Sequence, residues 1–276
     1  MLTENTGLPA PWGKFKPRGR DRLLLAITRL GLSRGAVKDW IGNLYRSRVS
    51  NSPVDLVRHG VKWRLHPWDN LTEGKILCGS KLHDRKELGA IRKKLQKGGA
   101  FVDVGANAGY YSLLAAAFGA GKVLALEPNP AMFSRLKFNI GINQYEDRIT
   151  ALQQGAGPRF GEMELYLHPQ NLGASSLLAI ECATESIRVT IKPLQHILGE
   201  QGFDQVEVLK IDVEGLEADI LVPFFQQAEK AGWPKLLVLE HALLNPDSFD
   251  LLAWLQDKGY QVALQTGTNT ILALGT

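Results

Sequence analysis

The sequence predicts an α/β protein built on a mainly parallel, doubly wound sheet of seven strands that is closed by an antiparallel hairpin. Three observations predict this fold. From Gly99 onward, short apolar runs alternate with helical patterns, and Gly or Pro stands at the joints, as in parallel α/β folds. The apolar runs are nearly continuous, which is typical of strands covered on both faces. The end, GYQVALQTGTNTILALG, has the pattern of a hairpin after the last helix.

The elements of this sheet follow one another in a regular order. The runs predicted as parallel strands are AFVDVG, KVLALE, RITALQQ, VEVLKID and KLLVLE. The helical patterns are YYSLLAAAFG, AMFSRLKFNIGIN, LEADILVPFFQQAEK and FDLLAWLQDK. The alternation breaks once, where two alternating runs flank a polar loop and predict an antiparallel insertion. We therefore predict one ligand-binding domain over residues 99–276, with an insertion at residues 160–192.

The first 98 residues divide into two predicted parts. Residues 1–50 form a basic, partly helical extension with ten Lys or Arg and three Asp or Glu, whereas the whole chain has a net charge of +4. Residues 51–98 combine a hairpin around His59-Gly60 with short helices, and we expect them to cover the functional site. Because the basicity belongs to the extension, it gives no reason to expect a nucleic-acid partner.

The start of the chain does not have the pattern of a signal peptide, because its basic residues come late and no small-residue cleavage site follows. No apolar run approaches the roughly 18 residues that a bilayer-spanning helix needs. The segment RDRLLLAITRLGL is basic and amphipathic, so it is a candidate for weak contact with an anionic membrane surface. The alternative is a helix packed on its own domain. With only Cys78 and Cys182, no disulfide framework is expected, and we predict a cytoplasmic protein.

The most specific local pattern is FVDVGANAGYYS, which contains the end of the first parallel strand. Ligands of such sheets bind where strands end and the chain order switches. Gly105 and Gly109 let the backbone approach a ligand, but the third glycine of the dinucleotide pattern Gly-x-Gly-x-x-Gly is missing. Asp103 and Asn107 suit an amino-acid moiety, so the loop favours S-adenosylmethionine, which has such a moiety and no phosphate. The cofactor-binding residues predicted here are Asp103, Val104, Gly105, Ala106, Asn107, Gly109, Tyr110 and Tyr111.

A second group of predicted cofactor contacts follows the next two strands. Glu127, in LALEPNP, lies 22 positions after Gly105, where an acid can accept hydrogen bonds from ribose hydroxyls. After the third strand, a small and polar stretch would lie beside an adenine edge. The predicted cofactor site is completed by Pro128, Asn129, Gln154, Gly155 and Ala156.

Together these motifs resemble the FkbM family of S-adenosylmethionine-dependent methyltransferases. The resemblance rests on FVDVGANAGYYS, LALEPNP, ASSL (174–177) and LKIDVEGLEADIL, and it covers the chain from roughly Gly99 onward. It implies a class I methyltransferase (Rossmann-like) fold and O-methylation of a hydroxyl on a sugar, a polyketide or another metabolite. Many members carry an aromatic residue followed by Glu just before the cofactor loop, and His83-Asp84 is the nearest match here.

The stretch LKIDVEGLEADIL carries three candidate catalytic groups. Methyl transfer from a sulfonium is an in-line displacement, and an alcohol must also lose its proton, so a general base would help. Asp212 ends the fourth strand beside the expected methyl group, so we predict that it contacts the cofactor or the acceptor, and the alternative is that it caps the next helix. Lys210 lies on the same side of the strand and could pair with that carboxylate or contact substrate. Glu214 could face the pocket or only favour the helix N-terminus.

Two further segments offer candidate groups. His241 follows the fifth strand and is the first candidate base, and a packed loop histidine is the alternative. In the insertion, His168 and Ser175-Ser176 could fold over the acceptor.

A divalent metal is a second route to an acidified hydroxyl. Asp212, Glu214 and Glu240 could hold Mg²⁺, but their spacing does not argue for a tight site, so we predict no metal. The sequence thus predicts an S-adenosylmethionine-dependent O-methyltransferase acting on a small-molecule or glycan hydroxyl. The alternatives are a binding or membrane-associated scaffold without turnover, and a nicotinamide-dependent oxidoreductase, which the missing third glycine disfavours. The identity of the acceptor and the oligomeric state stay open.

Overall fold

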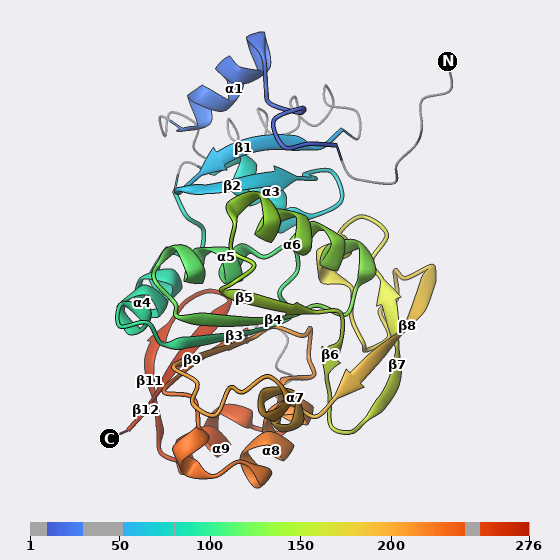
Figure 1. Ribbon diagram of the computed structural model, residues 1–276. Helices are drawn as coiled ribbons and strands as arrows, with labels where there is room; N and C mark the ends of the chain where they lie inside the picture. Colours follow the sequence, from blue (N-terminus) through green and yellow to red (C-terminus); the bar gives the residue numbers. More distant parts are fainter. Residues whose placement is uncertain (1–9, 30–51, 80, 241–248, 276) are drawn as a thin grey trace. The chain divides into compact units, whose positions relative to one another are not determined.

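A computed structural model describes residues 10–29, 52–79, 81–240 and 249–275 of the 276-residue chain (Figure 1). The chain forms two compact units, residues 1–82 (unit 1) and residues 83–276 (unit 2), and each is described by itself. Within the described ranges, no helix has the length and hydropathy that a bilayer-spanning segment needs.

Unit 1 is a β-hairpin with two described helices. Its elements are α1 (Gly19–Arg29), β1 (Val54–Arg58), β2 (Val61–Leu65) and α3 (Leu71–Cys78). The two strands pair antiparallel through a turn at His59-Gly60, where both residues have positive φ, as tight hairpin turns require. A helix and a hairpin are thus present in this region, as the sequence predicts, whereas the predicted boundary at residue 98 differs from the boundary between the two units. The rest of the basic segment, residues 1–9 and 30–50, lies outside the described residues.

The main sheet of unit 2 has the seven strands that the sequence predicts. They are β3 (Ala100–Val104), β4 (Lys122–Leu126), β5 (Ile149–Leu152), β9 (Val208–Ile211), β10 (Leu236–Glu240), β11 (Tyr260–Gln265) and β12 (Asn269–Leu274). Their order across the sheet is β11-β12-β10-β9-β3-β4-β5. The first five in the chain run parallel, and the terminal β11–β12 hairpin pairs antiparallel. The predicted fold class is confirmed.

Helices cover both faces of this sheet (Figure 1). On one face lie α4 (Arg85–Leu95), α5 (Tyr110–Ala117) and α6 (Pro130–Asn143), and on the other lie α7 (Leu194–Glu200), α8 (Glu217–Gln227) and α9 (Leu251–Asp257). Nearly every residue of the central strands β3, β4, β9 and β10 is buried, which explains their continuous apolar runs. Local signals set the helix starts: Asn129 caps α6 by accepting the Ala131 N–H, and Pro130 occupies the first turn.

The chain order switches between β3 and β9. From β3 the chain proceeds to β4 and β5 on one side, and it returns to β9 and β10 on the other. The carboxyl ends of β3 and β9 therefore flank the crevice where ligands of open α/β sheets bind.

The segment between β5 and α7 forms a second, three-stranded sheet. Its strands are β6 (Gly155–Ala156), β7 (Gly161–Leu167) and β8 (Glu185–Lys192), in the order β6-β8-β7. β7 and β8 pair antiparallel from Gly161↔Ile191 to Leu167↔Glu185. The connection between them contains a 3₁₀ turn (Leu172–Ala174), and this connection is placed over the site described next.

Candidate active site

The loop after β3, residues 105–109 (the cofactor loop), adopts a backbone that few side chains permit. Gly105, Asn107 and Gly109 all have positive φ, at 78°, 53° and 95°. A Cβ on Gly105 would lie 2.0 Å from the Asp212 carbonyl oxygen, and one on Gly109 would lie 2.3 Å from Leu113 Cδ1. The loop thus passes directly against the end of β9, which only glycine allows.

Glu127, which directly follows β4, binds the backbone of the cofactor loop. Its Oε2 accepts the Asn107 N–H at 2.7 Å, and its Oε1 accepts the Asn129 N–H at 2.8 Å. Burial raises the pKa of Glu127 to about 7, although the two N–H donors favour the charged form. A carboxylate has about four acceptor sites, so both oxygens can still accept hydrogen bonds from hydroxyl groups.

A pocket of about 640 Å³, including the solvent at its mouth, opens at this switch point. Many of the predicted cofactor residues line it, namely Val104, Gly105, Asn107, Glu127, Pro128, Asn129, Gly155, Ala156 and Asp212. Glu214, predicted as catalytic, lines it as well. The structure thus brings segments from four strand ends to one cavity, as the sequence predicts.

Other predicted cofactor residues lie elsewhere in unit 2. Asp103, Ala106, Gly109, Tyr110, Tyr111 and Gln154 do not line this pocket. Tyr110 stacks on His83 at 3.7 Å and donates to its carbonyl oxygen, while the Tyr111 hydroxyl donates to Asp84 at 2.9 Å. The two tyrosines therefore fasten α5 to the His83-Asp84 segment. The Gln154 Nε2 atom is buried and has no hydrogen-bond acceptor among the described residues.

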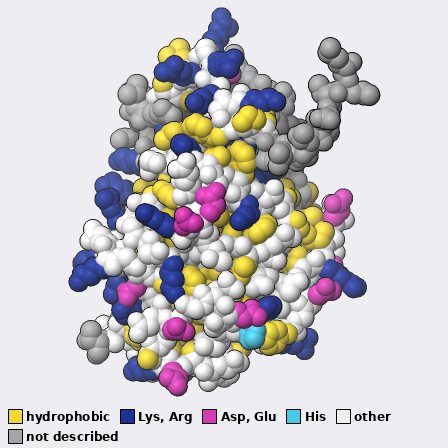
Figure 2. All heavy atoms as spheres, viewed as in Figure 1, with side chains coloured by type: hydrophobic (Ala, Val, Ile, Leu, Met, Phe, Trp, Pro, Cys, Tyr) yellow, Lys and Arg dark blue, Asp and Glu magenta, His cyan; other side chains and the backbone are white. Residues whose placement is uncertain are grey.

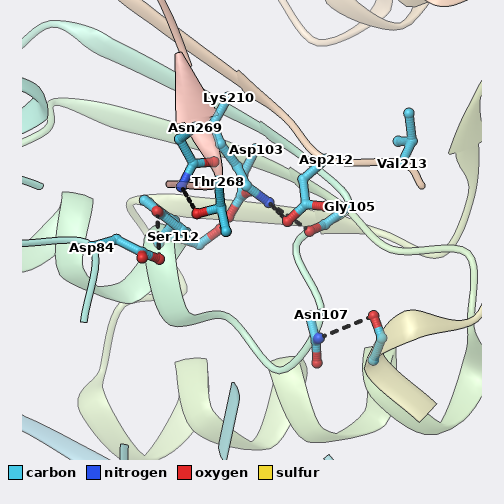
Figure 3. A network of polar contacts seen from close by, with 12 residues as sticks. Asp84, Asp103, Gly105, Asn107, Ser112, Lys210, Asp212, Val213, Thr268 and Asn269 are labelled. Atoms are coloured by element: carbon cyan, nitrogen blue, oxygen red, sulfur yellow. Dashed lines mark hydrogen bonds and ion pairs between the residues drawn. The ribbon is translucent and has the colours of Figure 1, made fainter. Parts of the chain in front are cut away.

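Lys210 is the centre of a polar network beneath the pocket (Figure 3). Its Nζ lies 3.3 Å from Asp103 Oδ1 and 3.2 Å from Asp212 Oδ2, and it donates to the Gly105 carbonyl oxygen at 3.0 Å. Although burial lowers the pKa of Lys210, the charges of Asp212 and Asp103 outweigh this effect and raise it, so the amine stays charged. Ser112 donates to the second oxygen of Asp103 at 2.6 Å. Lys210 thus ties the cofactor loop to β9 and holds Asp212 at the pocket.

Asp212 is not the cap of the following helix. α8 begins at Glu217, its N-cap residue is Leu216, and no side chain accepts a capping bond there. The Glu217 carboxylate instead accepts the Val213 N–H at 3.1 Å. The capping alternative for Asp212 is therefore excluded, and its carboxylate is left to line the pocket, with 37% of its side chain exposed.

Three carboxyl groups gather where β9 and β10 end. One oxygen each from Asp212, Glu214 and Glu240 lies within 4.8 Å of the others. Burial, the hydrogen bond to Asp212 and the neighbouring charges of Asp212 and Glu214 together raise the pKa of Glu240 to about 9. Burial and the charge of Asp212 raise the pKa of Glu214 to about 7. At neutral pH, Glu240 therefore carries a proton, which it can donate in its hydrogen bond to Asp212.

The same three oxygens are close enough for one divalent cation to contact them together, an arrangement that the sequence spacing did not predict. Either a shared proton or a bound cation would reduce the electrostatic repulsion among these three carboxyl groups. Glu214 and Gly215 both have positive φ, at 57° and 106°, so the chain turns sharply between β9 and α8.

The loop between β7 and β8, residues 168–184, covers the pocket. Asn107 Nδ2 donates to the Gly173 carbonyl oxygen at 3.5 Å, and Asn129 Nδ2 donates to the Leu172 carbonyl oxygen at 3.4 Å. His168 does not face the pocket; its Nδ1 accepts N–H groups of its own turn, from Gln170 and Asn171. Of the two serines predicted to lie over the acceptor, Ser175 lines the pocket, whereas Ser176 does not.

Several apolar side chains, and a loop glycine, line the pocket but were not named among the predicted site residues. They are Leu126, Met132, Leu165, Leu172, Gly173, Leu177 and Val213. Leu126, Leu177 and Val213 stand within the motifs quoted above, and Leu165 is the buried residue of the alternating run that forms β7, so these four carried a signal. The first candidate base, His241, lies outside the described residues, so its role stays a prediction.

Comparison with known proteins agrees with this geometry. Residues 103–262 match the family model described as methyltransferase FkbM domain. Methyltransferase sdnD from Sordaria araneosa is 27% identical over 193 residues, which cover 58% of this chain and 73% of that protein. Methyltransferase 1 from Beauveria bassiana is 28% identical over 186 residues, which cover 59% of this chain and 73% of that protein.

Among solved structures, the FkbM methyltransferase from Methylobacillus flagellatus has a TM-score of 0.47 and 19% identity to this chain. The alignment covers 63% of this chain but only 43% of that one. The family model, in contrast, spans more than half of the chain and includes the cofactor loop, Glu127 and the Asp212 segment. The chain belongs to the FkbM methyltransferase family.

Proposed function

We propose that this protein is an S-adenosylmethionine-dependent O-methyltransferase that acts on a hydroxyl of a sugar, a glycan or a secondary metabolite. One observation carries the proposal: the Asp212 carboxylate lines the pocket at the switch point, and buried Lys210 holds it there. The acceptor class rests on the family to which the chain belongs.

The residues around the pocket fit S-adenosylmethionine, which supplies an electrophilic methyl group. The Glu127 oxygens have free acceptor positions for ribose hydroxyls, and the small residues Gly155 and Ala156 leave room for an adenine ring. Gly105, which packs its backbone against the end of β9, lines the pocket at the end of β3. The cofactor loop lacks the third glycine of the dinucleotide pattern, and the described residues that line the pocket include no Lys or Arg to receive a pyrophosphate, which disfavours a dinucleotide.

Asp212 is the proposed acceptor of the hydroxyl proton. An alcohol must lose its proton as its oxygen attacks the methyl carbon, and a carboxylate within reach can take that proton. Lys210 fixes Asp212 in position through their ion pair, because its amine is anchored on Asp103 and Gly105 as well. A neutral amine acceptor has no such need, so this carboxylate favours O-methylation.

Two measurements test the proposal. Isothermal titration should show binding of S-adenosylmethionine and no binding of NAD; binding of NAD alone would contradict the cofactor assignment. Transfer of a radiolabelled methyl group should then be measured with a panel of sugars and hydroxylated metabolites, beside the matching amines. Labelling of the amines but not of the alcohols would reject O-methylation while leaving the methyltransferase assignment intact.

A further inference from the structure

Unit 1 carries most of the positive charge of the chain. Residues 1–82 hold fifteen Lys or Arg and six Asp or Glu, whereas residues 83–276 hold seventeen and twenty-two. Five cations lie within nine residues before and in α1, and all five side chains are exposed: Lys14, Lys16, Arg18, Arg20 and Arg22. Figure 2 shows Lys and Arg side chains gathered at the top of the view, where Figure 1 draws α1.

This basic segment is held on the hairpin. Asp55, which is buried in β1, accepts the N–H groups of Gly13 and Phe15 at 2.7 and 3.1 Å. Arg64 clamps the same carboxylate and also donates to the carbonyl oxygen of Pro11 at 2.9 Å. The cations that follow are therefore presented from a fixed backbone.

The outer side of α1 also exposes a large apolar residue. Leu23 is 64% exposed, more than any other large hydrophobic side chain that the structure describes, whereas Leu25 is buried and the helix contacts α3. Arg20 lies three residues before Leu23, so the two side chains share one face of the helix. Packing on its own unit accounts for the inner side of α1 and leaves this outer face unexplained.

An open groove lies beside this face. Its lining includes the two cations Lys16 and Arg22, the indole ring of Trp12 and several apolar side chains, and the acid Asp55, which is paired with Arg64, also borders it. Lys16 Nζ lies 4.7 Å from the centre of the Trp12 ring. Tryptophan and cations with apolar stems are the residues that suit the boundary between water and lipid.

We propose that unit 1 docks on an anionic phospholipid bilayer, with Leu23 entering the boundary between headgroups and acyl chains and the five cations contacting lipid phosphates. Exposed apolar side chains flanked by cations are the features of helices that lie in a membrane surface. Each Lys or Arg near an anionic surface contributes separately to this attraction. A nucleic acid would also attract the cations, but it would leave Leu23 in water. The inference is independent of the proposed methyl acceptor.

Sedimentation of the full chain with lipid vesicles tests this docking. We expect binding to vesicles of phosphatidylcholine containing about one-third phosphatidylglycerol, little binding to pure phosphatidylcholine, and weakening by salt. Arg20→Gln with Arg22→Gln should lower the partition coefficient at least about ten-fold, and Leu23→Ser about five-fold at unchanged charge. The matched control, Lys93→Gln with Lys94→Gln, removes two exposed cations of α4 and should bind like the wild type.

Three results would overturn the proposal. One is a wild-type protein that stays in the supernatant with anionic vesicles. Another is an equal loss of binding in the α1 and α4 variants, which would mean that net charge alone is responsible. The third is tighter binding to a single-stranded or duplex RNA of mixed sequence than to the anionic vesicles, unchanged by Leu23→Ser. Thermal unfolding of each variant checks that a loss of binding does not reflect a loss of fold.

Discussion

Lys210 Nζ lies 3.2 Å from Asp212 Oδ2, and the same amine lies 3.3 Å from Asp103 Oδ1. Asp103 is fully buried, whereas Asp212 lies at the pocket, so one cation serves a structural carboxylate and a functional one together. Asp103 and Lys210 are direct neighbours across the β3–β9 pairing, which places both groups at the switch point of the sheet.

Lys210→Met should strongly destabilise the protein, because it leaves the buried Asp103 without its counter-charge. Breaking a buried ion pair on one side costs about 3–5 kcal/mol of unfolding free energy. Urea unfolding at pH 7 measures the loss. The double variant Asp103→Asn with Lys210→Met should recover part of it, since neither charge is then left alone. A single variant as stable as the wild type would show that the pair does not hold β3 and β9 together.

Asp212→Asn should lower methyl transfer by at least about 100-fold, because the amide keeps the shape of the side chain but cannot accept the proton. Steady-state turnover with the acceptor found by the screen is the measurement. Asp219→Asn is the matched control, since Asp219 is an exposed acid in the first turn of α8 and only complements the helix dipole. Equal turnover of the two variants would remove Asp212 from the chemistry.

Gly105→Ala should abolish binding of S-adenosylmethionine and destabilise unit 2. Its Cβ would lie 2.0 Å from a backbone oxygen, and the positive φ of Gly105 disfavours any side chain. Titration calorimetry and thermal unfolding measure both effects. Gly199→Ala, within α7 and with open space around its Cβ, should instead be neutral or stabilise by about 0.5–1 kcal/mol. A Gly105→Ala protein that binds the cofactor normally would contradict the close approach of loop and strand.

Affinity for S-adenosylmethionine should rise with pH if ionised Glu127 accepts the ribose hydroxyls. Burial raises the pKa of Glu127 to about 7, so its ionised fraction, and with it the affinity, should increase about ten-fold from pH 6 to pH 8. Titration across this range measures the slope. Glu127→Gln should bind weakly and lose the slope, whereas Glu162→Gln, at an exposed acid of β7, should keep both affinity and slope. The same slope in all three proteins would assign it to another group.

The central strands β3, β4, β9 and β10 were predictable from the sequence because each is an apolar run that ends at Gly or an acid. β6 was not predictable, since two small residues, Gly155 and Ala156, carry no periodic pattern and pair only in the folded chain. The short helix α7 was missed for the same reason. Local patterns therefore identify the long elements, and tertiary pairing creates the short ones.

The site was predictable where it depends on strand ends. Glu127 and Asp212 follow from the rule that ligands bind at the carboxyl ends of parallel strands. The sharing of Lys210 between two carboxylates was not predictable, because it depends on the register between β3 and β9. Tyr110 was expected in the cofactor site because it follows Gly109 in the motif, but the first turn of α5 directs its ring toward His83.

Glu240→Gln should stabilise the protein increasingly as pH rises from 5 to 9. The folded-state pKa of Glu240, about 9, lies above its ordinary value of 4.5, so the unfolded chain ionises first and stability falls across this window. The variant has no ionisable group at this position, so its stability does not fall for this reason. Since the carboxyl is partly open to solvent, we expect about 1 kcal/mol at pH 9, or about 2–4 °C in Tm, and no difference at pH 4.5. A pH-independent difference would refute the shared proton. If millimolar Mg²⁺ raises the Tm of the wild type but not of the variant, a cation rather than a proton joins Glu240 to Asp212.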